Sequence, residues 1–205
     1  VSDVAMNQRV TLNAVDGVDM KVPGGSFGVK KAVGAGTVWN EGFRGAGVGV
    51  AIIDSGVSRV KGLAGAGKVV YGPDLSFESQ AANLTNKDTY GHGTHLAGII
   101  AGRDPEAPAD VKDGTYDYFL GVAPDAKIIS LKVADRNGAT DVSQILAAID
   151  WVVQHKNDPG LNIRVLNLSF GTDGVQDYRI DPLAYAVEVA WKKGIVVVVS
   201  AGNGG

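Results

Sequence analysis

Short apolar runs alternate along the chain with segments of helical periodicity. Continuous runs rich in β-branched residues are typical of strands that are buried on both faces, as in parallel sheets. The sequence contains four such runs and a shorter, weaker one. The predicted strands are 48–53, 127–133, 163–168 and 195–199, with 68–71 as the weaker candidate.

Helical patterns lie between these runs. Apolar residues recur at spacings of three and four over 142–153 and 183–191, which predicts two amphipathic helices and places Trp191 in the core. A third, shorter helix is predicted at 92–101. Capping signals mark the expected ends of the two longer helices: Asp141 with Gln144, Asp181-Pro182, and Lys192-Lys193-Gly194.

Strands that alternate with helices predict βαβ units. The expected fold class is α/β, with three layers and a mostly parallel sheet that has helices on both faces. Residues 1–30 are polar and irregular, and we interpret them as an N-terminal arm or processing region. Residues 31–205 are then the folded domain.

Composition excludes several classes of protein. The 205 residues contain no cysteine, so disulfide scaffolds, thiolate zinc sites and cysteine nucleophiles are excluded. With 19 Lys and Arg against 22 Asp and Glu, there is no basic excess for binding nucleic acid, which is not an expected partner. No apolar run approaches the ~18 residues of a membrane span, so no membrane partner is expected.

Polar residues follow three of the predicted strands. In an open α/β sheet, ligands bind outside the carboxyl ends of the strands. An aspartate there can orient an imidazole that acts as a general base, and a side-chain amide can stabilise an oxyanion. The candidates for these three roles are Asp54, His92 within Gly91-His92-Gly93-Thr94-His95, and Asn203 within Ser200-Ala201-Gly202-Asn203.

Three motifs in this order resemble those of the subtilisin-like serine proteases, or subtilases. They are Ala51-Ile52-Ile53-Asp54-Ser55-Gly56, Gly91-His92-Gly93-Thr94-His95-Leu96-Ala97-Gly98 and Ser200-Ala201-Gly202-Asn203. The resemblance runs from about residue 33 to the last residue. It implies a secreted serine endopeptidase in which Asp54 orients His92, His92 is the base and Asn203 serves the oxyanion hole.

The resemblance also implies where the substrate binds. Ser169-Phe170-Gly171 corresponds to a segment that pairs with the substrate backbone, and Gly138-Ala139-Thr140 corresponds to the facing edge. Together these segments are expected to hold an extended peptide between them as an added strand. Peptides or proteins are therefore the expected substrates, with broad specificity.

The family's nucleophilic serine lies in a Gly-Thr-Ser-Met-Ala segment that these 205 residues do not contain. The fold is therefore expected to be incomplete at its C-terminal end, with an open apolar face, and the chain alone is expected to be inactive. A companion C-terminal fragment would carry the nucleophile. The alternative is a non-catalytic peptide-binding fragment or pseudoprotease.

Three further features bear on partners and cofactors. Many subtilases carry a calcium-binding His-Pro-Asp-Leu segment where this chain reads Val60-Lys61-Gly62-Leu63. The chemistry requires no cofactor, and structural calcium is retained only as an alternative. Val1-Ser2-Asp3-Val4 resembles the end of a subtilase prodomain. The acidic residues of a surface insertion could bind a hard cation, but a solvated loop is favoured: Asp110, Asp113 and Asp117.

Two sequence features suggest other ligands, a nucleotide and a zinc ion. Residues 62–68 match part of a phosphate-binding loop, but Val69 replaces the required Ser or Thr and a strand follows instead of a helix. His92 and His95 could form a zinc pair, but the chain lacks the glutamate and thiolates that usually complete such a site. Nucleotide and zinc binding are therefore not favoured.

Overall fold

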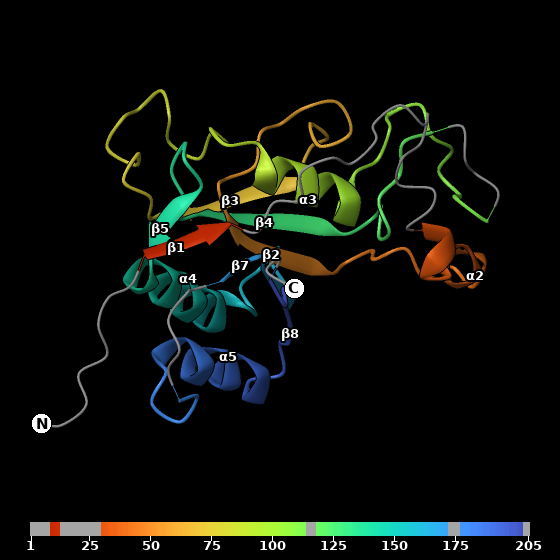
Figure 1. The fold of residues 1–205 in the computed structure, drawn as a ribbon. Helices are drawn as coiled ribbons and strands as arrows, with labels where there is room; N and C mark the ends of the chain where they lie inside the picture. The colour runs from red at the N-terminus through yellow and green to blue at the C-terminus, as the bar shows by residue number, and fades with distance from the viewer. Residues whose placement is uncertain (1–8, 13–29, 114–117, 172–176, 203–205) are drawn as a thin grey trace, which may run out of the picture.

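A parallel sheet of five strands forms the centre of the molecule in a computed structural model that describes residues 9–12, 30–113, 118–171 and 177–202 (Figure 1). The strand order is β3-β4-β2-β6-β8, and each neighbouring pair is parallel. All five predicted strands are present. Their bounds are Gly49–Asp54 (β2), Val69–Asp74 (β3), Lys127–Lys132 (β4), Ile163–Leu168 (β6) and Val196–Val199 (β8).

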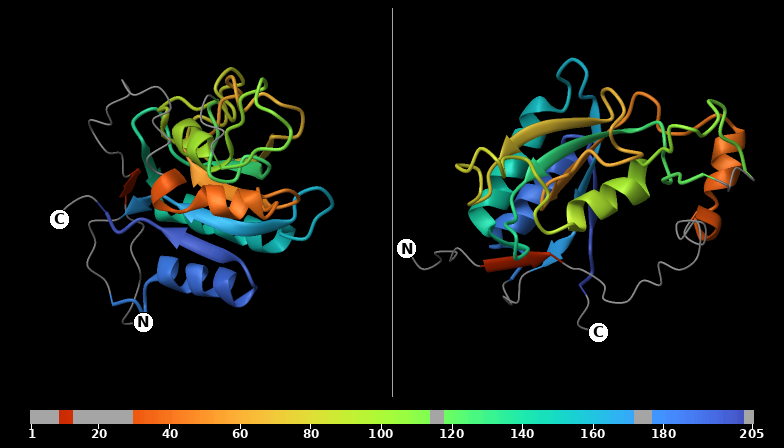
Figure 2. Two further views of the ribbon diagram at one scale, coloured as in Figure 1. Left: turned by 90° about the vertical axis from the view of Figure 1, so that its right-hand side faces the viewer. Right: turned by 90° about the horizontal axis from the view of Figure 1, so that it is seen from above.

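Helices cover both faces of this sheet. Helix α3 (His92–Ala101) lies on one face, and α4 (Val142–His155) and α5 (Pro182–Lys192) lie on the other (Figures 1 and 2). The alternation of side chains along β2 explains this arrangement. Val50 and Ile52 share a buried cluster with residues of α3, whereas Ala51 and Ile53 share one with residues of α4 and α5. The predicted three-layer α/β fold is confirmed.

The predicted helix starts are also confirmed. Asp141 and Gln144 form a reciprocal capping box at the start of α4. Asp181 caps α5 by accepting a hydrogen bond from the backbone N–H of Leu183 at 2.8 Å. A short helix that the pattern did not predict, α2 (Ala35–Asn40), precedes the sheet and buries Trp39.

The prediction that Trp191 belongs to the core is wrong, because its exposed fraction is 65%. Trp191 follows the buried Ala190, and one residue rotates a helical side chain by about 100°, so its ring turns away from the core. The nearby edge strand β8 is also uncovered, since Val196, Val198 and Val199 are 60%, 47% and 59% exposed. An open apolar face, as expected from the sequence, is therefore present.

A second, smaller sheet involves the N-terminal arm. Strand β1 (Arg9–Leu12) pairs antiparallel with β5 (Ala139–Asp141) on one side and with β7 (Phe170–Gly171) on the other. For these four residues the prediction of an irregular arm is wrong. Polar and apolar residues alternate over these four positions, a short strand pattern that the prediction overlooked. Figure 1 shows β1 lying beside β5. Within the described part of the chain, no helix is both long and apolar enough to cross a membrane.

Candidate active site at the carboxyl ends of the strands

Asp54 is the last residue of β2, the central strand of the parallel sheet. Its side chain is fully buried. The backbone N–H of Ser55 donates to Asp54 Oδ1 at 2.7 Å, which fixes the carboxylate at the carboxyl edge of the sheet. Ligands bind at this edge in α/β proteins.

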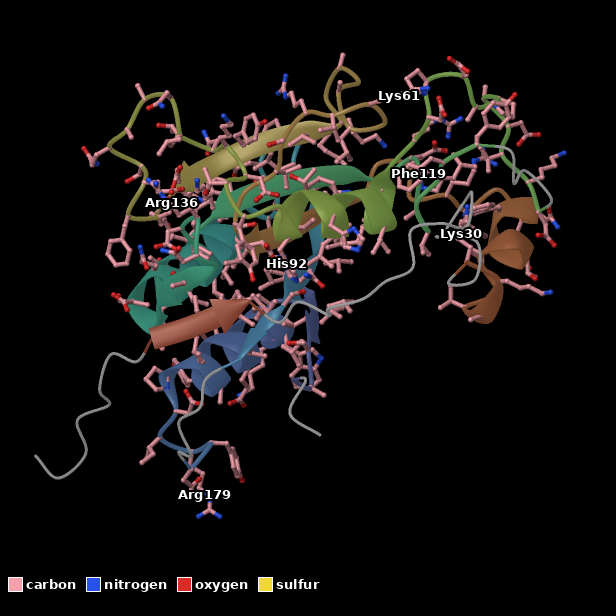
Figure 3. All side chains as sticks on the ribbon, turned by 45° about the horizontal axis from the view of Figure 1, so that its top comes forward. Lys30, Lys61, His92, Phe119, Arg136 and Arg179 are labelled. Atoms are coloured by element: carbon pink, nitrogen blue, oxygen red, sulfur yellow. The ribbon has the colours of Figure 1, made fainter. Side chains whose placement is uncertain are left out.

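His92 is the first residue of α3 (Figure 3), and its ring faces Asp54. The distances from His92 Nδ1 to Asp54 Oδ1 and Oδ2 are 2.9 Å and 3.0 Å. The His92 side chain is 8% exposed, so the pair is shielded from water, which strengthens the interaction. The structure thus brings together two residues that are 38 positions apart in the sequence.

Glycine at position 93 permits this close approach. A β-carbon there would overlap the carbonyl oxygen of Gly56 and lie 3.0 Å from Asp54 Oδ1. Any larger residue would push α3 away from β2 and separate the imidazole from the carboxylate. The requirement for close contact between α3 and β2 therefore explains the glycine that follows His92 in the motif.

The two segments expected to bind an extended peptide hold the chain's own strand β1 between them. On one side, Val10 is paired with Thr140 and Thr11 with Ala139. On the other side, Thr11 is paired with Gly171 and Leu12 with Phe170.

The neighbouring residues of these two segments have other contacts. Gly138 has a left-handed φ of 71°. It lies under the ring of Tyr90, because a β-carbon at Gly138 would be 2.9 Å from the ring. The hydroxyl of Ser169 accepts a hydrogen bond from Asn167 Nδ2 at 2.8 Å. Neither residue is a member of the pairs that β1 makes.

Two predicted residues lie outside the described part of the chain: Asn203 and Asp117. The motif that contains Asn203 begins at Ser200, whose backbone N–H donates to the carbonyl oxygen of Leu168, the last residue of β6, at 3.2 Å. Asp110 pairs with Arg44 and Lys112, each at 3.1 Å. Within the described ranges, no group of three or more metal-binding side chains lies close enough together to hold an ion.

In the segment that resembles a phosphate-binding loop, residues 62–68, the lysine binds backbone carbonyl oxygens of the protein itself. Lys68 Nζ donates to the carbonyl oxygens of Pro124 and Ala126 at 2.6 Å and 3.0 Å. Burial lowers the pKa of Lys68, as does the nearby Arg103, whereas Asp125 acts in the opposite direction. The lysine therefore serves the packing at the amino ends of the strands, far along the sheet from Asp54.

Sequence reasoning missed two polar groups behind the Asp54–His92 pair. Asp88 contacts both Ser55 and the start of α3. Glu78 forms a buried ion pair with Lys132 at 2.7 Å, and Lys132 lies beside Asp54 in the register of β2 and β4. Neither acid belongs to a recognisable motif. Asp88, three residues before the Gly91 N-cap, carries the weak signal of a polar residue just ahead of a helix.

A parallel sheet with helices on both faces and an aspartate–histidine pair at its carboxyl edge is an arrangement that also occurs in α/β serine hydrolases. Within that class, residues 45–205 match the model of the subtilase family, Peptidase_S8. The chain belongs to the subtilase family, and the resemblance seen in its motifs is confirmed.

Curated relatives and a solved structure agree with this assignment. Minor extracellular protease Epr of Bacillus subtilis (strain 168) is 32% identical over 82% of this chain and 22% of its own length. Subtilisin DY of Bacillus licheniformis is 35% identical over 80% of this chain and 50% of its own. The crystal structure of a cold adapted subtilisin-like serine proteinase is 30% identical with a TM-score of 0.57, over 78% of this chain and 48% of that one. The chain thus spans half or less of the length of each.

Proposed function

We propose that these residues are the part of a serine endopeptidase that supplies the base and its orienting carboxylate. The contact between His92 Nδ1 and Asp54 carries the proposal. Asp54 accepts the Nδ1 proton, so the other ring nitrogen can take the proton of a serine hydroxyl as that oxygen attacks the peptide carbonyl. His92 then gives the proton to the leaving amine, and water hydrolyses the acyl-enzyme in the same way.

The remaining parts of the machinery are assigned by resemblance. The side-chain amide of Asn203 would donate a hydrogen bond to the oxyanion that forms in acyl transfer. The serine would come from a companion segment, because Gly-Thr-Ser-Met-Ala is not present in these 205 residues. No cofactor takes part in this chemistry, and structural calcium stays a prediction.

The proposed substrate is an extended peptide or protein segment. The support is that 139–141 and 170–171 already pair with an extended segment, β1, through backbone hydrogen-bonding edges. Backbone pairing depends little on side chains, so it favours broad specificity. One relative is named an extracellular protease, and we propose that this protein is secreted as well.

The function can be tested with a serine-directed fluorophosphonate probe and a peptidase assay. The 205 residues alone should take up no probe and hydrolyse no peptide. The same residues extended through, or mixed with, the subtilase nucleophile segment should do both. Labelling of the 205 residues alone would contradict the proposed place of the nucleophile. No hydrolysis with the segment present would favour the alternative, a non-catalytic peptide-binding protein.

We further propose that residues 1–30 form a processing region, the end of a prodomain, whose strand β1 occupies the substrate-binding edges. A chain that begins after Leu12 should bind a fluorescent extended peptide at least about tenfold more tightly than the intact chain, because the intact chain must first release β1. Fluorescence anisotropy measures both affinities. Thr11→Pro, which removes a backbone donor from the strand, should behave like the deletion. Equal affinities for all three chains would contradict this role.

A further inference from the structure

A second aspartate, Asp88, lies behind the Asp54–His92 pair and is linked to it by Ser55. The Ser55 hydroxyl oxygen is 2.7 Å from Asp88 Oδ1 and 3.2 Å from Asp54 Oδ1. The backbone N–H of Gly93 donates to the same hydroxyl oxygen at 3.0 Å. Ser55 is fully buried, so water does not compete for this hydroxyl.

The single proton of the Ser55 hydroxyl can be given to one acceptor only. The two carboxylates compete for it, and the shorter distance favours Asp88. Asp54 Oδ1 is then left to the backbone N–H of Ser55 and to His92 Nδ1. A hydroxyl that instead donated to Asp54 Oδ1 would withdraw charge from the oxygen that faces the imidazole.

Asp88 is itself held by the start of α3. Its Oδ1 accepts from the backbone N–H groups of Gly91 and Tyr90 at 2.6 Å and 3.2 Å. Its Oδ2 accepts from the backbone N–H and the hydroxyl of Thr94 at 2.8 Å and 2.5 Å. The N-cap residue of α3, Gly91, has no side chain that could cap the helix, and Asp88 takes over that function.

We propose that Asp88 is a positioning residue that directs the Ser55 hydroxyl away from Asp54 and so reserves the Asp54 carboxylate for His92. The same five hydrogen bonds fix the start of α3, where His92 lies, relative to the end of β2. The role rests on the proposed acid–base pairing of Asp54 with His92. In this role Asp88 acts on His92 through Ser55 and through the start of α3.

The decisive change is Asp88→Asn, which keeps the size of the side chain but leaves only one acceptor oxygen. That oxygen cannot serve both Thr94, which now donates to Oδ2, and the Ser55 hydroxyl, which now donates to Oδ1. An asparagine is as good a helix cap as aspartate, so its oxygen is expected to stay with Thr94. The Ser55 hydroxyl then turns to Asp54 and weakens the charge that stabilises protonated His92. Loss of the Asp88 charge acts in the same direction.

The measurement is the titration midpoint of His92 in the 205-residue chain, followed by NMR of ¹³C-labelled histidine. The chain has three histidines, and H95Q and H155Q variants assign the signals. The titratable groups beside the ring are Asp54, which contacts Nδ1, and Tyr90, whose ring centroid is 6.4 Å from that of His92. Lys132, paired with Glu78, lies next to Asp54 in the register of β2 and β4. All of these residues are unchanged in every variant. We expect Asp88→Asn to lower the midpoint by about 0.5 to 1 pH unit.

Ser55→Ala separates the proton-directing role from a merely structural one. Alone, it should leave the midpoint within about 0.2 unit of the original, because the hydroxyl does not donate to Asp54 when Asp88 is present. In the double variant with Asp88→Asn, Ser55→Ala should raise the His92 midpoint part of the way back to its original value. The proposal would be overturned by an unchanged His92 midpoint in Asp88→Asn. It would also be overturned if the decrease in Asp88→Asn were equally large in the double variant with Ser55→Ala.

Neither readout depends on hydrolysis. If Asp88→Asn does not fold, Ser55→Ala still decides the matter, since a rise in the His92 midpoint would mean that the hydroxyl donates to Asp54, contrary to the proposal. If the midpoints shift as expected but no peptide is hydrolysed with the nucleophile segment present, the proposed function fails while the role of Asp88 stands.

Discussion

His92→Ala is expected to lower kcat for peptide hydrolysis by about 10⁶-fold in the polypeptide that includes the nucleophile segment. Asp54→Asn should lower it by about 10⁴-fold, with KM little changed. The larger decrease in kcat is expected for His92→Ala because His92 would itself move the proton. Asp54 only orients His92, through contacts of 2.9 Å and 3.0 Å. Steady-state kinetics on a fluorogenic peptide measures both variants.

The reason for the Asp54→Asn effect lies in the tautomer of His92. The backbone N–H of Ser55, 2.7 Å from Asp54 Oδ1, would hold the amide oxygen of the asparagine. The amide NH₂ group would then face His92 Nδ1 and force the proton onto the other ring nitrogen, which could no longer act as a base.

A matched control is Asp150→Asn, the same change at an exposed position of α4 where the carboxylate contacts Gln154. It should leave kcat unchanged. A loss smaller than tenfold for Asp54→Asn would contradict the orienting role.

Hydrophobic pattern alone predicted the parallel sheet and its helices because these elements are buried on defined faces. The four stronger strand predictions, such as 163–168, begin and end within one residue of the observed strands, and the predicted helix 92–101 coincides with α3. Burial on both faces of β2 requires apolar residues from Val50 to Ile53, and such a run is visible without knowledge of partners. The positions of Asp54 and His92 follow, since both sit at the ends of such elements.

Features created by distant contacts could not be predicted in this way. Strand β1 pairs with two edges that are far away in the sequence, and the polar–apolar alternation of Arg9–Leu12 spans only four residues. Asp88 acquires its contact with Ser55 only when α3 is folded against the end of β2. Trp191 fits the apolar spacing of α5, but the pattern cannot distinguish the rim of a buried stripe from its centre.

Glu78→Gln is expected to destabilise the fold by about 3–5 kcal/mol at pH 7, because it leaves the ammonium of Lys132 buried without a counter-charge. Lys132 is 0% exposed, and its Nζ donates to Glu78 Oε2 at 2.7 Å. Its other acceptors are the carbonyl oxygens of Leu84 and Lys87 in the segment that leads to Asp88. Urea denaturation of both proteins at pH 7 measures the difference in the free energy of unfolding.

The loss should depend on pH. Burial alone would raise the pKa of Glu78, but hydrogen bonds from Lys132 and Thr89, the Lys132 charge and the Arg136 backbone outweigh it and hold the pKa below its usual value. A depressed folded-state pKa gives stability that is complete above the unfolded value of about 4.3 and is lost as the pH falls through the folded value. The difference between the original protein and Glu78→Gln should therefore be largest near pH 7 and shrink below about pH 4.

Glu188→Gln is the matched control, because Glu188 pairs with Lys192 on the exposed surface of α5. That change should leave the free energy of unfolding almost unchanged, since water screens an exposed pair and two long side chains lose freedom in forming it. If Glu78→Gln and Glu188→Gln lowered the free energy of unfolding equally, the buried ammonium of Lys132 would not need a counter-charge. A Glu78→Gln loss that stayed constant from pH 7 to pH 3.5 would place its origin in packing rather than in the ionised carboxylate.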